Sequence, residues 1–209
     1  DLLRHTSGLG YNYGTNSYID SLYKKIENIN NNEEFVEKLF SIPLFSEPST
    51  EWRYGFSADV LGRLIEEITG KSLYEFLSEN IFKPLEMNDT HFQLPLNKTN
   101  RFIPVYAYDE QDNLLKEMRE WNYMRFMMKN RESGGGGLIS TTSDYINFCS
   151  MLLNGGSFNG NQIISSNSIK KMTQNQIGSL NYPWGEGIKF GYGFYVVTDS
   201  QKSDLSDSN

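Results

Sequence analysis

The stretch DLLRHTSGL at residues 1–9 decides the fold, together with WRYGFSADVLG at residues 52–62 and SGGGGLIST at residues 133–141. Residues 1–9 already carry apolar side chains that need a core, although no earlier segment builds one. We therefore expect the 209 residues to be the middle of a longer protein, with catalytic parts outside them.

The composition is that of a globular protein. Apolar residues make up 38% of the chain and aromatic residues 14%, far from the low hydrophobicity and high charge of disordered chains. A length of 209 residues fits one domain with a substantial core.

The charge and the apolar runs bear on two classes of partner, nucleic acid and membranes. A net charge of −7 with scattered basic residues argues against nucleic acid, which is bound through clustered Lys and Arg. No run reaches the roughly 18 apolar residues of a membrane span. Neither observation fixes the compartment, so a periplasmic, secreted or cytoplasmic location all remain open.

The one cysteine, Cys149, lies in a helical pattern and is predicted to be a small core residue without a disulfide.

Apolar periodicity predicts a mainly helical chain. Ser57 is the expected N-cap of the clearest helix, residues 58–69, which ends at Gly70. Its expected apolar face holds Val60, Leu61, Leu64, Ile65 and Ile68. Ser72 and Glu75 have the form of a capping box at the start of the next helix. The other expected elements are helices at residues 17–28, 33–40, 142–154 and 166–173, a hairpin at 105–113, a strand at 190–197 and a polar tail or loop at 199–209.

Five segments in order give the chain its family character: residues 2–9, Tyr54 in residues 52–62, and residues 82–90, 133–145 and 190–194. In these segments the sequence resembles the serine β-lactamase superfamily, which contains class C β-lactamases, penicillin-binding DD-peptidases and β-lactamase-like carboxylesterases. The resemblance implies an α/β (α+β) fold of the two-lobed β-lactamase/transpeptidase type. Residues 1–209 would be the central part of a single domain, mostly the helical lobe with part of the antiparallel sheet.

The resemblance also implies a mechanism. In the family a serine of a Ser-x-x-Lys motif attacks the acyl carbonyl, and a tyrosine acts as general base; Tyr54 matches the position of that tyrosine. A phenol with its reference pKa of about 10 is a poor base at neutral pH unless a cation lies beside it. Tyr54 therefore needs a lysine partner.

Two Ser-x-x-Lys matches occur, from Ser21 to Lys24 and from Ser168 to Lys171, and we interpret both as chance matches. The family's nucleophile motif precedes the segment matched by residues 2–9, whereas both matches follow it. We therefore expect the nucleophile to lie outside this chain.

The neighbours of Tyr54 and the glycine run are the predicted substrate pocket: Trp52, Phe56, Gly135 and Gly136. Phe56 stands where class C enzymes and DD-peptidases usually carry the asparagine of Tyr-x-Asn, which favours the carboxylesterase branch. The triplet from Trp184 to Glu186 imitates the family's Trp-Gly-Gly element but precedes the strand that the element should follow.

The two histidines are not predicted to be catalytic. His5 is interpreted as a hydrogen-bonded structural residue, and His91 as an exposed loop residue without partners at metal-ligand spacing. We accordingly predict no metal site and no cofactor.

The resulting hypothesis is a serine hydrolase that cleaves esters through an acyl-serine intermediate. DD-peptidase or β-lactamase activity on an amide or β-lactam is the alternative within the same class, and an inactive fragment or binding module is the alternative from another class. The substrate would be a small molecule, and the oligomeric state stays open. We also expect the isolated 209 residues to expose apolar helix faces and to be poorly soluble.

Overall fold

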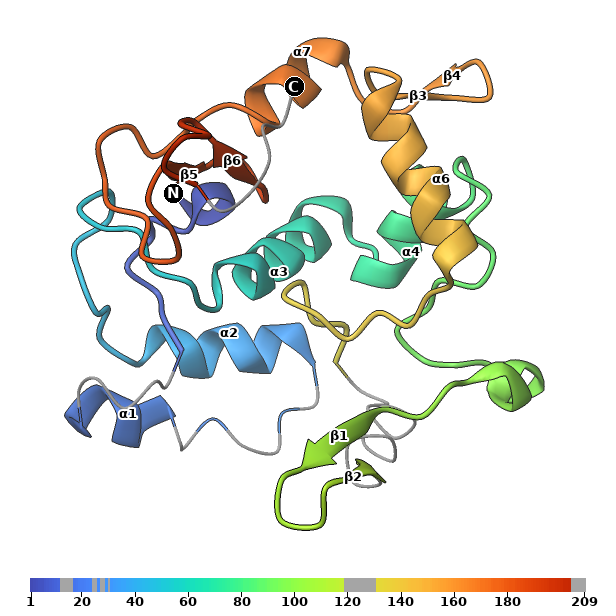
Figure 1. Ribbon diagram of the computed structural model, residues 1–209, viewed down its shortest axis with the longest axis horizontal. Coiled ribbons are helices and arrows are strands. Elements are labelled where there is room, and N and C mark those ends of the chain that lie inside the picture. Colours follow the sequence, from blue (N-terminus) through green and yellow to red (C-terminus); the bar gives the residue numbers. More distant parts are fainter. Residues whose placement is uncertain (12–16, 24–25, 27–28, 30, 119–130, 204–209) are drawn as a thin grey trace.

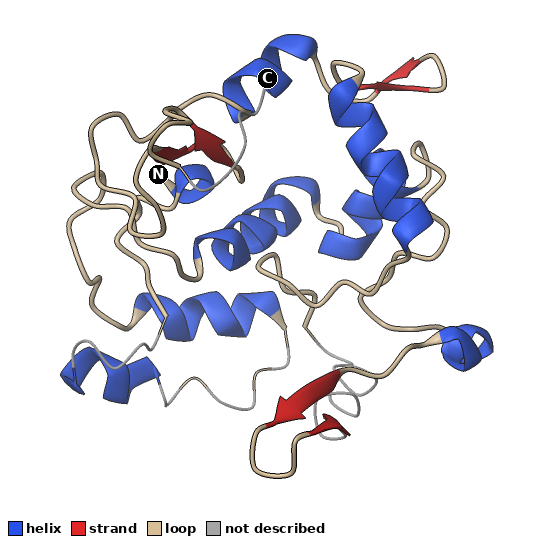
Figure 2. Cartoon of the chain, viewed as in Figure 1, coloured by secondary structure: helices blue, strands red, loops and turns tan. Residues whose placement is uncertain are grey.

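The computed structural model describes residues 1–11, 17–23, 26, 29, 31–118 and 131–203. Helices dominate this part of the chain, and its strands form three separate two-stranded antiparallel sheets (Figures 1 and 2). The helical segments are η1 (Leu2–Arg4), α1 (Ser17–Tyr23), α2 (Asn32–Phe40), α3 (Ser57–Thr69), α4 (Leu73–Leu77), η2 (Ser78–Phe82), η3 (Leu96–Arg101), α6 (Thr142–Leu153) and α7 (Ser166–Met172). The paired strands are β1 (Tyr106–Asp109) with β2 (Leu114–Glu117), β3 (Ser157–Phe158) with β4 (Asn161–Gln162), and β5 (Ile188–Phe190) with β6 (Tyr195–Val197).

Helix α3 lies in the middle of the molecule and contacts α2, α4 and η1 (Figure 1). The helix predicted at residues 58–69 is confirmed, and it ends at Gly70, whose φ of 66° is the left-handed conformation that glycine adopts easily. The predicted N-cap is wrong. Ser57 is the first residue of the helix and makes no capping bond; it is fully buried, with its hydroxyl 2.8 Å from that of Ser7. The Ser57 hydroxyl therefore pairs with Ser7, which is distant in sequence, and not with a backbone N–H of its own helix.

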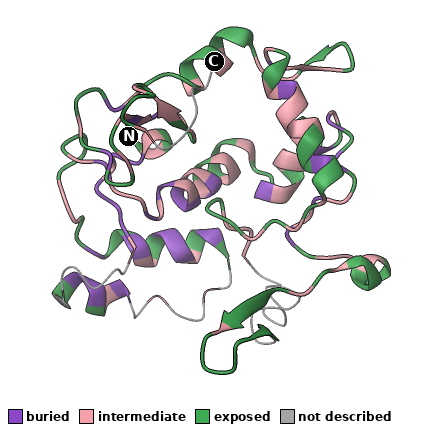
Figure 3. Cartoon of the chain, in the orientation of Figure 1, coloured by how far each residue is buried: buried purple, intermediate pink, exposed green. Residues whose placement is uncertain are grey.

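The predicted apolar face of α3 is only partly buried. Val60 is buried, whereas Leu64 is 44% and Ile68 74% exposed (Figure 3). Helix α6 likewise exposes Tyr145 and Ile146. The expected exposure of apolar helix faces is therefore seen on both helices.

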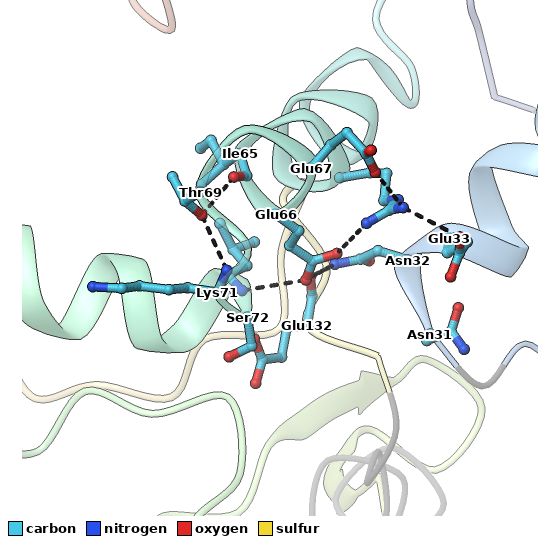
Figure 4. A network of polar contacts seen from close by, with 12 residues as sticks. Asn31, Asn32, Glu33, Ile65, Glu66, Glu67, Thr69, Lys71, Ser72 and Glu132 are labelled. Carbon is cyan, nitrogen blue, oxygen red and sulfur yellow. Dashed lines mark hydrogen bonds and ion pairs between the residues drawn. The ribbon is translucent and has the colours of Figure 1, made fainter.

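A polar network joins α2, α3 and α4 (Figure 4). The buried Asn32 donates one hydrogen bond to Glu66 at 2.9 Å and another to the backbone oxygen of Glu132 at 2.8 Å. Glu66 also accepts from the backbone N–H of Leu73, at the start of α4. The predicted capping box of Ser72 with Glu75 is confirmed at the same helix end.

The strand predicted at residues 190–197 is instead a hairpin of β5 and β6. The chain reverses between them, where Gly193 has a φ of 84° and the N–H of Gly191 donates to the oxygen of Phe194 at 2.6 Å. Two glycines in three residues make this turn possible, and their effect outweighs the β-rich composition on either side.

The remaining predictions vary in outcome. The hairpin at 105–113 is confirmed as β1 and β2, which projects from the helical body in Figure 1. Helix 142–154 is confirmed with Thr141 as its cap, and Cys149 on it is half-buried. Part of the predicted helix 17–28 and residues 204–209 of the predicted tail lie outside the described residues. No helix in the described ranges is long and apolar enough to span a membrane.

Candidate active site

Tyr54 lies in the segment that leads into α3. The backbone of this segment is tied to the start of the chain by a hydrogen bond of 2.8 Å from the N–H of Arg53 to the oxygen of His5. Tyr54 is half-buried, and its hydroxyl makes no hydrogen bond to any described residue. The phenol is therefore held by its ring, and its oxygen is free to bind another group.

Aromatic rings surround Tyr54. Its ring centroid lies 4.9 Å from that of His5, 5.4 Å from Tyr11, 5.3 Å from Trp184 and 6.3 Å from Trp52. The rings of Tyr11 and Trp184 meet Tyr54 edge-on, His5 is tilted and Trp52 is stacked, and such arrangements at these distances are typical of stabilising aromatic pairs. Of the predicted pocket residues, Trp52 is thus next to Tyr54.

Trp52 supports the Tyr54 ring from the interior. It is 6% exposed and packs in a core cluster with Ile177, Tyr182, Ile188 and Phe190. This cluster joins the segment before α3 to the β5–β6 hairpin. The position of Tyr54 therefore depends on residues more than 120 positions later in the chain.

His5 is buried, but its Nδ1 atom lacks the hydrogen bond expected of a hydrogen-bonded structural residue. Its Nδ1 atom has no partner, and the imidazole packs instead against the rings of Trp52, Tyr54 and Phe190. Burial lowers its pKa to about 4, so His5 is neutral at pH 7. The backbone of His5 is left-handed, with a φ of 56°. A neutral ring at this position adds packing and no charge.

Phe56 shares one ring neighbour, Tyr11, with Tyr54 and otherwise packs among different residues. The Phe56 ring packs with Tyr11, Tyr23 and Phe35 against the core cluster of α1, α2 and α3. The role of Phe56 in a substrate pocket stays a prediction.

The glycine run packs against the first turns of α3. A Cβ atom added to Gly134 would lie 2.1 Å from the backbone oxygen of Ala58, so only glycine fits there. Gly135 and Gly136 line an apolar cavity of about 710 Å³ between α3, α4 and the glycine run. The structure thus puts them on this cavity, whereas Tyr54 and Trp52 belong to the aromatic cluster; their pocket role also stays a prediction.

Asp59 fixes the glycine run to α3, and the sequence did not single it out. This carboxylate is 2% exposed, forms an ion pair with Arg131 and accepts a hydrogen bond of 2.5 Å from Ser133. The available signal was an acidic residue among apolar ones on a helix, which suggests a buried partner. Trp184 was considered only as part of a triplet that imitates the family's Trp-Gly-Gly element, so its contact with Tyr54 was not predicted.

Of the two Ser-x-x-Lys matches, the one from Ser168 to Lys171 lies wholly within the described residues, and no catalytic pair is formed there. The hydroxyl of Ser21 donates to the backbone oxygen of Tyr18 at 2.7 Å, and Lys24 lies outside the described residues. The hydroxyl of Ser168 lies 2.8 Å from that of Ser165, the cap of α7, and Lys171 is exposed.

His91 is half-buried, contrary to the prediction of an exposed loop residue. Its backbone pairs with Ile139, and its ring nitrogens lie 2.9 Å from the Tyr74 hydroxyl and 3.2 Å from the Lys98 ammonium. Burial, with a smaller effect of Lys98, lowers the pKa of His91. Among the described residues, no three His, Cys, Asp or Glu side chains are grouped as metal ligands.

Comparison with known proteins gives the chain its relatives. The family model described as Beta-lactamase matches residues 1–204. Protein Rv1367c of Mycobacterium tuberculosis is 30% identical over 97% of this chain and 52% of its own length. Lovastatin esterase of Penicillium rubens is 28% identical over 85% of this chain and 44% of its own length. The chain therefore spans about half the length of these curated relatives.

A solved structure agrees with this relationship. EstCE1, described as a hydrolase with promiscuous acyltransferase activity, aligns with a TM-score of 0.78 and 23% identity over 96% of this chain and 56% of its own. At this identity the likeness establishes the fold alone. The predicted mixed α/β fold of the β-lactamase/transpeptidase type is confirmed.

Proposed function

This chain belongs to the Beta-lactamase family, and from this premise we propose that the protein is a serine hydrolase that cleaves carboxylic esters. Tyr54 is the proposed general base. The nucleophilic serine and its lysine are proposed to lie outside the 209 residues, because the hydroxyls of Ser21 and Ser168 bond to residues three positions earlier in their own segments.

The observation that carries the proposal is the state of Tyr54. Its ring is held by four aromatic neighbours, while its hydroxyl has no partner among the described residues. Because the ring of this half-buried residue is packed while its oxygen has no protein partner, the phenol can bond to a substrate or to a catalytic neighbour.

In the proposed reaction, the serine oxygen attacks the ester carbonyl and its proton passes to the Tyr54 oxygen. The tetrahedral intermediate then expels the alcohol, which takes that proton from Tyr54, and leaves an acyl-serine. In the second half water attacks this ester and gives a proton to Tyr54, and the serine oxygen takes this proton as it leaves and the acid is released. A lysine ammonium beside Tyr54 would keep enough of the phenol ionised at neutral pH.

An ester is favoured over a β-lactam or a peptide as substrate. Penicillin-type and peptidoglycan-type substrates carry a carboxylate, which a site would bind with a cation. The described rings around Tyr54 carry no charge, since His5 is neutral at pH 7. Lovastatin esterase, whose name states that it is an esterase, is one of the curated relatives.

The test compares p-nitrophenyl butyrate with nitrocefin, using the natural protein with any sequence that flanks these 209 residues. Tyr54→Phe keeps the ring and removes the base, so we expect kcat for the ester to fall by about 100-fold or more with little change in KM. Hydrolysis of nitrocefin alone would favour the β-lactamase alternative. No turnover of either substrate by the wild-type protein would favour a binding module.

The position of the nucleophile is tested separately. Turnover of p-nitrophenyl butyrate by the 209 residues alone would contradict the proposal that the serine lies outside them. Ser21→Ala and Ser168→Ala in the same chain would then show which hydroxyl reacts.

A further inference from the structure

Trp184 is an exposed aromatic residue beside the proposed base. Its side chain is 58% exposed, yet its ring centroid lies 5.3 Å from that of Tyr54 and 5.1 Å from that of Trp52. Trp52 is buried behind these rings, so Trp184 is the member of the group that faces outward. Tryptophan in such a position is typical of surfaces that bind an apolar group.

The backbone around Trp184 holds the ring in place. Gly185, the next residue, lies so close to Ile188 that an added Cβ would come within 2.5 Å of its side chain. The oxygen of Gly187 accepts hydrogen bonds from Thr198 at 2.8 Å and from Asp199 at 3.1 Å. The turn that carries Trp184 is therefore hydrogen-bonded to the residues that follow β6, beside the β5–β6 hairpin.

The described aromatic neighbours of the two rings carry no charge at pH 7. The described ring neighbours of Tyr54 are His5, Tyr11, Trp52 and Trp184, and the imidazole of His5 is neutral at pH 7. An uncharged aromatic or branched group can pack on this surface without losing the hydration of a charge.

We propose that Trp184 determines acyl specificity by packing against a bulky, uncharged acyl group, aromatic or branched, while the ester carbonyl lies at Tyr54. This inference rests on the proposed function. It goes beyond that function because it names the residue that selects the substrate and the chemical class that it selects.

The kinetic test uses p-nitrophenyl benzoate and p-nitrophenyl acetate, which share a leaving group and differ in the acyl group. In Trp184→Ala we expect the ratio of kcat/KM for benzoate to that for acetate to fall by about tenfold or more, because lost apolar contact acts on the larger group. Trp184→Phe keeps an aromatic ring and should retain most of the ratio. Tyr195→Ala, which removes a comparably exposed ring on β6, should leave the ratio unchanged. Equal losses for both esters in Trp184→Ala would overturn the inference.

A binding test separates this inference from the proposed function. Butyl phenyl ketone resembles the ester but cannot be hydrolysed, and the NMR signal of the Trp184 indole N–H, assigned by its absence in Trp184→Ala, should shift on its addition but not on addition of acetone. A shift without turnover of either ester would support the binding surface and overturn the hydrolase. Turnover of the esters without a shift would overturn the role of Trp184 and leave the hydrolase intact.

Discussion

Asp59 in α3 accepts a hydrogen bond from the hydroxyl of Ser133 at 2.5 Å, although 74 positions separate the two residues. The same carboxylate forms an ion pair with Arg131, whose guanidinium carbon lies 3.6 Å from the ring centroid of Phe35. The buried Asp59, together with its partner Arg131, thus joins α2, α3 and the segment that opens the glycine run.

Asp59→Ala should destabilise the fold strongly. It leaves the guanidinium of Arg131 in a site where burial already lowers its pKa, without the carboxylate that compensates this effect. Breaking a buried ion pair from one side costs about 3–5 kcal/mol of unfolding free energy, which urea titration followed by circular dichroism would measure.

The matched control is Glu67→Ala in the same helix, because Glu67 pairs with Arg63 while its side chain is 69% exposed. An exposed pair contributes about 0–1 kcal/mol. If the two variants lost equal stability, the Asp59 pair would not be an anchor.

Gly134→Ala should displace the glycine run, whereas Gly136→Ala should not. The added methyl group of Gly134→Ala would lie 2.1 Å from the backbone oxygen of Ala58, but at Gly136 no atom lies within 4 Å. Backbone cannot move aside as a flexible side chain can, so we expect a loss of about 1–3 kcal/mol in unfolding free energy for Gly134→Ala. Thermal melts of both variants test this, and similar melting temperatures would show that the run is not pinned to α3.

Local signals in the sequence predicted those parts of the fold that local interactions decide. Ser72 and Glu75 form the predicted capping box because both partners lie in one helical turn. Ser57 had the same chemistry, but its hydroxyl pairs with Ser7, a residue fifty positions away that the local pattern does not reveal.

Only those contacts of the candidate site that join residues within one sequence motif could be predicted. Trp52 and Tyr54 are neighbours in sequence and in space. Trp184 reaches Tyr54 because the core cluster of Trp52 draws the β5–β6 hairpin to the segment before α3, and no periodicity encodes such a contact.

Asn32→Ala should weaken the junction of α2, α3 and α4 that Figure 4 shows. The change removes two hydrogen bonds, to Glu66 and to the backbone oxygen of Glu132, from a residue that is 3% exposed. Glu66 keeps its hydrogen bond from Leu73, so the backbone oxygen of Glu132 is the acceptor that loses its partner. One unpaired acceptor costs about 1–3 kcal/mol, so chemical unfolding should show a loss in that range. Asn80→Ala, which removes one hydrogen bond of 2.8 Å from an exposed side chain, is the control and should be nearly neutral. A neutral Asn32→Ala would mean that water replaces the amide at no cost.

His5 should make the stability depend on pH between about 4 and 6.5. Burial lowers its pKa in the folded state from 6.5 to about 4, so in this window the unfolded chain binds a proton that the folded chain does not. The contribution of His5 to stability is therefore complete above pH 6.5 and is lost as the pH falls towards 4.

His5→Phe keeps a ring and removes the titration, so the slope of unfolding free energy against pH should decrease by up to about 1.4 kcal/mol per pH unit. Phenylalanine at this position would have to adopt the left-handed backbone of His5, which costs some stability. This cost is the same at every pH, so it does not change the slope of unfolding free energy against pH. His91, whose pKa is also lowered, is the control: His91→Gln should remove only its own part of the slope. An unchanged slope in His5→Phe would show that the imidazole is open to water and already charged at pH 5.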